Sequence, residues 1–275
     1  MLSKCLKHEF RATYALILPI LLGVLVFSGI TGLTSTALYS ADSPTVLEII
    51  AVFAQLIFNI MVGAASIGVT IVCVLRYWRS FHSDEGYLTM TMPVSTHTHI
   101  FSKLIVAEIW LLVTVLVLYL ASIIANVGLF QEVFSAVEDV EMAGIADEVV
   151  DIAEMRQVFL FLLLCLIILV VSPAAGLLQM YAAISLGHSF NKYKKLLSVV
   201  FIYVFNQVLG ILYFIPMLLL LVKAFENEAI FFADFNTVMS GMNIFMVVLL
   251  VLSILQGVGF YFMTHYFLNK KLNLQ

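Results

Sequence analysis

Six stretches of the chain contain no Asp, Glu, Lys or Arg, and their lengths constrain the fold more than any other feature. A helix needs about 20 apolar residues to cross ~30 Å of hydrocarbon. The uncharged stretches cover residues 12–41, 49–75, 109–131, 157–191, 196–222 and 235–269 and are 30, 27, 23, 35, 27 and 35 residues long. Only 11% of the chain is charged, too little to cover a soluble core of this size. We therefore predict an all-α membrane protein, with six transmembrane helices at approximately 15–37, 49–75, 104–128, 157–186, 197–222 and 241–267.

The distribution of charge predicts how these helices are oriented. Of the 13 Lys and Arg residues, 11 lie at the two termini or in the second and fourth loops, and 13 of the 17 acidic residues lie in the other loops. Positive charge accumulates on the cytoplasmic side of membrane proteins. We predict a multi-pass protein of the cell (plasma) membrane with both termini in the cytoplasm, forming a single transmembrane domain over residues 1–275.

Two amphipathic segments flank the predicted spans. At the N-terminus, apolar residues share a helical face between lysines, which predicts a short interfacial helix; an ordinary positively charged flank is the alternative. Residues 131–156 alternate acidic and apolar side chains at helical spacing, which predicts one or two short extracellular helices. Their acidic surface is either a solvated face or a collector for a cationic substrate.

The sequence contains none of the common catalytic or cofactor-binding motifs. No HExxH, GxSxG or GxxxxGK[ST] string occurs, and the three cysteines form no CxxC pair. His97 and His99 are two residues apart, which places them on different helical faces, and we expect His188 and His265 to stand alone. A net charge of −4 excludes a basic nucleic-acid-binding surface. We predict no catalytic residue, no metal ligand and no cofactor bound by this chain.

Few polar side chains interrupt the predicted spans. In hydrocarbon each needs a hydrogen-bond partner or a water-lined path, so these residues either bond helices together or line a passage. They are Gln55, Asn59, Asn126, Gln179, Asn206, Gln207 and Gln256. Pro173 and Pro216 also fall within spans, where proline can kink a helix.

The second loop, residues 76–102, has the most distinctive local pattern. Ser83 or Asp84 can cap a short helix that extends to Met90, and Pro93 ends it. Ser95 can then cap the helix that enters the third span. We predict a short amphipathic helix at the cytoplasmic surface between two membrane helices, a geometry suited to transmitting force from a soluble partner.

The residues of this loop resemble the first cytoplasmic loop of ABC-2 type transporter permeases. The strings are Asp84-Glu85-Gly86-Tyr87-Leu88, Thr91-Met92-Pro93-Val94-Ser95 and Ser102-Lys103-Leu104. The family pattern is E-x-G-T-L-E-x-L-L-x-T-P-V-S followed by G-K-L, and a D-E-G-Y-L-T variant recurs in Gram-positive members. Tyr87, Thr89 and Ser102 depart from the general pattern, and these departures favour the Gram-positive peptide-resistance branch.

The resemblance implies a permease subunit of an ATP-driven exporter. A separate ABC ATPase subunit would bind ATP and dock on the loop, and a second permease half would complete the pathway. The implied coupling residues are Asp84, Glu85, Gly86, Tyr87, Leu88, Met92 and Pro93. In such permeases the halves meet through spans one, two and five, which makes Gln55, Asn59, Asn206 and Gln207 candidates for the pathway. The alternatives are a non-transporting sensory or structural membrane protein and a membrane-embedded enzyme.

Overall fold

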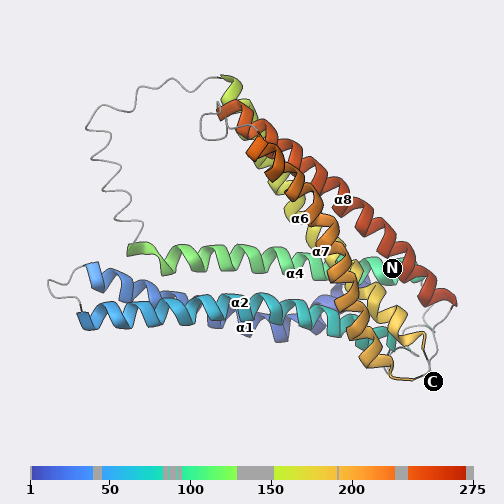
Figure 1. The fold of residues 1–275 in the computed structure, drawn as a ribbon. Coiled ribbons are helices and arrows are strands. Elements are labelled where there is room, and N and C mark those ends of the chain that lie inside the picture. The colour runs from blue at the N-terminus through green and yellow to red at the C-terminus, as the bar shows by residue number, and fades with distance from the viewer. Residues whose placement is uncertain are drawn as a thin grey trace. The chain divides into compact units, whose positions relative to one another are not determined.

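The computed structural model consists of helices and short turns, with no strand, over the residues that it describes, which are 2–39, 45–82, 86, 91, 95–128, 152–190, 192–226 and 235–270. Each of its six long helices is apolar and long enough to cross a membrane, which confirms the predicted number of spans and indicates a multi-pass membrane protein. In chain order these are α1 (Leu2–Tyr39), α2 (Thr45–His82), α4 (Thr96–Ala125), α6 (Ile152–His188), α7 (Lys194–Glu226) and α8 (Phe235–Lys270) (Figure 1).

The helices extend beyond most of the predicted span boundaries. Hydropathy detects only the uncharged portion of a helix, whereas the backbone hydrogen-bond ladder continues through charged residues outside the hydrocarbon. At the N-terminus α1 begins at Leu2 and continues without interruption, so the predicted interfacial segment is the first part of a longer helix. Its placement in the membrane surface stays a prediction. The acidic segment lies mostly outside the described residues, which resume where α6 begins at Ile152.

The chain divides into two compact units, each described here by itself. Unit one comprises Met1–Leu6, Val74–Glu108 and Val150–Gln275, and so contains the end of α2, the start of α4 and helices α6 to α8. Unit two comprises Lys7–Cys73 and Ile109–Val149, and so contains most of α1 and α2 and the remainder of α4.

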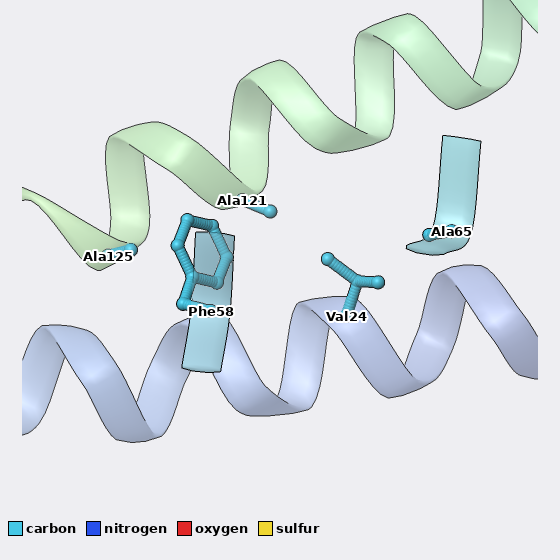
Figure 2. Close-up of a cluster of buried hydrophobic side chains, with 5 residues drawn as sticks. All are labelled: Val24, Phe58, Ala65, Ala121 and Ala125. Carbon is cyan, nitrogen blue, oxygen red and sulfur yellow. The ribbon is translucent and has the colours of Figure 1, made fainter. Parts of the chain in front are cut away.

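The core of unit two forms where α1, α2 and α4 run side by side. Val24 of α1 and Phe58 of α2 are each 2% exposed and pack with three alanines, Ala65, Ala121 and Ala125 (Figure 2). The small alanine side chains of α4 leave room for the Phe58 ring between neighbouring helices. Close approach of this kind is the main source of helix association in a membrane, where lipid removes the hydrophobic driving force.

Helices α1 and α4 approach each other closely at Gly32. A Cβ atom added at Gly32 would lie 2.3 Å from the carbonyl oxygen of Ile124, so only glycine allows this spacing. Further along the same pair of helices, the Trp110 indole N–H donates to the Thr13 hydroxyl at 2.8 Å. The contact between α1 and α4 therefore combines a small-residue approach with a buried hydrogen bond.

In unit one, α6, α7 and α8 form a bundle of long helices (Figure 1). Gly257 of α8 lies beside Ala175 of α6, and a Cβ atom added there would meet the Ala175 side chain at 3.6 Å, an ordinary contact distance, so this packing does not require glycine. Pro173 and Pro216 lie inside α6 and α7, as expected, and both helices continue past them.

The Gly32 contact predicts a position-specific loss of stability. Gly32→Ala places a methyl group against the Ile124 carbonyl and should lower the free energy of unfolding by about 1–3 kcal/mol. Gly23→Ala in the same helix is the control, since nothing lies within 4 Å of its added Cβ. Thermal unfolding in detergent measures both variants, and equal midpoints would contradict the α1–α4 packing described here.

Candidate functional site: the helix ends around the second loop

Most of the predicted coupling residues lie outside the described part of the chain. They are Asp84, Glu85, Tyr87, Leu88, Met92 and Pro93. Gly86 is described, and it is helical and buried. A Cβ atom at Gly86 would lie 2.6 Å from the carbonyl oxygen of Phe81 and 2.9 Å from its carbonyl carbon, so this position requires glycine. The glycine of the loop motif thus has a packing role against the end of α2.

The end of α2 is held against α6 by a buried tyrosine. Tyr77 stacks on Tyr181 with ring centroids 3.9 Å apart, and its hydroxyl forms a 2.8 Å hydrogen bond with the Ser185 hydroxyl. Both tyrosines are fully buried. The stack and the hydrogen bond fix the last two turns of α2, which lead directly into the loop.

The start of α4 is attached to the end of α2 by a buried lysine. The Lys103 ammonium donates to the Ser80 hydroxyl at 2.9 Å and lies 5.3 Å from the centroid of the Phe81 ring. Lys103 is the lysine of the Ser-Lys-Leu string in the sequence motif, and it is only 5% exposed. Its contacts join the two helices that border the loop, one on each side.

A second attachment joins the start of α4 to the end of α8. The Thr96 hydroxyl donates to Oδ1 of Asn269 at 2.8 Å, and Nδ2 of Asn269 donates to Nε2 of His265 at 2.8 Å. His97 stacks on His265 with ring centroids 4.0 Å apart and shares a hydrogen bond with the Tyr261 hydroxyl. We call these five residues the α4–α8 clasp. The expectation that His265 stands alone is wrong, because the fold brings together residues far apart in sequence.

His188 is likewise joined to neighbouring helices. The Trp78 indole N–H donates to Nε2 of His188 at 3.0 Å, and Nδ1 of His188 lies 2.9 Å from the Ile184 carbonyl oxygen. This pairing fits a neutral imidazole that donates through Nδ1 and accepts through Nε2. The residue is therefore part of a link between α2 and α6, and the expectation that it stands alone is also wrong.

These contacts together form what we call the loop frame: Tyr77, Lys103, the Trp78–His188 pair and the α4–α8 clasp. The described residues contain no cluster of three or more His, Cys, Asp or Glu side chains that could hold a metal ion. The contacts of the frame are stacking and hydrogen bonds between neighbouring helix ends. Such an arrangement holds the helix ends in fixed positions relative to one another.

Four polar side chains within the spans form a network across unit one. Nε2 of Gln179 donates to Oδ1 of Asn206 at 3.1 Å, and Nε2 of Gln256 donates to Oε1 of Gln179 at 3.1 Å. The Tyr213 hydroxyl donates to Oε1 of Gln256 at 2.6 Å. The network crosses α6, α7 and α8, which confirms interhelical bonding as a role of these residues.

The four candidate pathway residues differ in their surroundings. Asn206 belongs to the network just described, whereas Gln55, Asn59 and Gln207 form no hydrogen bond within the described part of the chain. Gln55 and Asn59 lie one turn apart on α2 and border a shallow, open hollow with apolar neighbours. Gln55 and Asn59 belong to unit two and Asn206 and Gln207 to unit one.

One polar residue was overlooked in the sequence. Glu108 lies within α4, and both of its carboxylate oxygens are buried without a hydrogen-bond partner among the described residues. In the sequence, Glu108 is the charged residue directly before the uncharged stretch 109–131, so it was not considered as a polar residue inside a span. An acidic residue between Lys103 and the apolar remainder of a long helix was the signal that could have identified it.

Comparison with known proteins does not assign a family. No family model, no curated protein and no solved structure matches the chain. A functional proposal therefore depends on the residues of the chain and on the arrangement of its helix ends.

The polar network predicts that Gln179 and Gln207 differ in their contribution to stability. Gln179→Leu removes two interhelical hydrogen bonds and should lower the free energy of unfolding by about 1–2 kcal/mol. Gln207→Leu serves as the matched control, because it removes no hydrogen bond and should leave stability unchanged or slightly higher. Unfolding followed by circular dichroism in detergent tests this difference. A Gln207→Leu loss as large as that of Gln179→Leu would show that the network is not what stabilises unit one.

Proposed function

We propose that the chain is the permease subunit of an ATP-driven exporter, working with a separate ABC ATPase subunit and a second permease half. Three features support the proposal. The chain has six apolar helices, the second loop resembles the ATPase-coupling loop of ABC-2 type permeases, and the sequence has no P-loop of its own. ATP would bind to the partner subunit, and this chain would act without catalytic residues.

The attachment of both ends of the loop is the observation that carries the proposal. The helix before the loop is fixed by Tyr77, and the helix after it is fixed by Lys103 and the α4–α8 clasp. A force applied to the loop would therefore reach α2, α4, α6 and α8 together. Packed helix ends of this kind move as bodies rather than deforming, which is what an ATP-driven switch between inward and outward access requires.

The unpaired polar residues support a pathway shared with a second half. Asn59 and Gln207 are exposed and make no hydrogen bond within the described residues, a costly arrangement if their side chains face lipid. Contact with a second permease half or with water would satisfy them. We therefore propose that α2 in unit two and α7 in unit one each present a polar side chain to a second permease half or to water, while Asn206 also bonds α7 to α6.

Copurification tests the proposed coupling loop. The tagged chain, purified from its native membrane, should retain a P-loop ATPase, and Leu88→Asp should weaken that association at least tenfold by placing a charge at an apolar anchor. Val133→Asp, in the acidic segment on the predicted opposite side, is the control and should retain the partner. Absence of any ATPase from the wild-type preparation would favour the sensory or structural alternative. Full retention by Leu88→Asp would remove the loop from the docking surface.

The predicted orientation has its own test. In a background with Cys5, Cys73 and Cys165 replaced by serine, an impermeant thiol reagent added to intact cells should label Glu141→Cys and not Lys194→Cys. Permeabilised cells supply the control, in which both positions should react. Labelling of Lys194→Cys alone in intact cells would reverse the topology and place the second loop outside the cell.

A further inference from the structure

The turn between α6 and α7 contains a tyrosine in an unfavourable backbone conformation. Tyr193 has a φ of 56°, in the left-handed region that costs a non-glycine residue about 1 kcal/mol. Its carbonyl oxygen accepts the Leu197 N–H at 2.9 Å, so this conformation begins α7. Glycine or asparagine would adopt it at lower cost.

Packing within the chain does not explain the tyrosine side chain. It is 78% exposed, the largest fraction among the exposed large hydrophobic residues, and it makes no hydrogen bond or ring contact with any described residue. A strained, exposed aromatic residue points to a role toward something outside the chain.

Lysines surround Tyr193 in the sequence, at positions 192, 194 and 195. Lys192 is exposed, and the Lys195 ammonium lies 5.2 Å from the centroid of the Trp78 ring. The Trp78 indole N–H donates to His188 at 3.0 Å. This hydrogen bond fixes the position of the indole ring that contacts the Lys195 ammonium. Neither Lys192 nor Lys195 forms an ion pair with a described residue.

The local sequence supplies no negative charge to balance these lysines. No Asp or Glu occurs between Glu154 and Glu226, a stretch that contains nearly all of α6 and α7 and the turn that joins them. Both helices are apolar and long enough to span a membrane, so in a bilayer the turn that joins them would lie at or near the layer of lipid headgroups. Tyrosine and tryptophan favour that level, and lysines there attract anionic lipids.

We infer that Tyr193, Lys192, Lys195 and Trp78 form a binding site for the headgroup of an anionic phospholipid. The two ammonium groups pair with the phosphate and with any further negative charge of the headgroup. The phenol and indole rings lie at the boundary between headgroups and acyl chains. The site belongs wholly to unit one. It depends on the membrane location of the chain and not on the proposed ATPase partner.

Native mass spectrometry of the purified chain tests the site with phosphatidylglycerol and phosphatidylcholine of identical acyl chains. The wild-type chain should retain phosphatidylglycerol in preference to phosphatidylcholine. The double variant Lys192→Gln/Lys195→Gln should lose roughly ten- to thirtyfold of that preference. Arg156→Gln/Lys223→Gln removes the same charge from α6 and α7 on the predicted opposite side of the membrane and should change the preference less than twofold. Equal losses in the two double variants would show a diffuse charge effect and overturn the site.

Tyr193→Gly and Tyr193→Asn separate lipid binding from folding. Both residues tolerate the left-handed conformation, so thermal stability in lipid-free detergent should be equal to or higher than that of the wild type. Retention of phosphatidylglycerol should nevertheless fall several-fold, because the aromatic contact is lost. Unchanged retention in these stable variants would exclude Tyr193 from the site and overturn the inference.

Discussion

Hydrocarbon offers no hydrogen-bond partner to a polypeptide, and this constraint determines where polar contacts can form in the chain. Backbone N–H and C=O groups in a span bond within their own helix, except where a proline interrupts the ladder in α1, α6 and α7, and this yields six long helices. Side-chain amides in the spans must also be paired, as Gln179 is with Asn206 and Gln256. The denser polar and aromatic contacts lie at the helix ends, where Tyr77, Lys103 and the α4–α8 clasp join four helices around the second loop.

The loop frame provides a physical route by which movement of the loop would reach the attached helices. A loop on loosely held helices would absorb a partner's movement, whereas this loop follows a fully buried tyrosine stack and precedes a buried lysine. Gly86 adds a further constraint, because its backbone lies against that of Phe81. Asn59 and Gln207 are exposed and form no hydrogen bond among the described residues, which fits contact of each with a second permease half or with water. In this proposal the ATPase docks on the second loop, whereas polar residues within α2 and α7 contribute to the pathway.

The sequence predicts the helices well because charge is excluded from hydrocarbon, so uncharged stretches mark spans directly. It does not predict the clasp, because His97 and His265 are 168 positions apart in the chain. The sequence around each histidine does not indicate that the two rings stack. The loop motif identifies Gly86, but the close approach to Phe81 that requires glycine is visible only in three dimensions. Glu108 lies inside the predicted span 104–128, but it was counted only as the residue before the uncharged stretch 109–131, and its burial within the helix is visible only in three dimensions.

The central claim is that the loop frame moves as one body when a partner acts on the loop. The direct measurement is the distance between spin labels at Leu75→Cys in α2 and Val258→Cys in α8, two exposed positions of unit one, in a background without native cysteines. Double electron–electron resonance is recorded on the complex with the ATPase, with and without a non-hydrolysable ATP analogue. The account predicts one narrow distance distribution that the nucleotide leaves unchanged. A shifted or broadened distribution with nucleotide would contradict it, because the helix ends would then separate rather than move together.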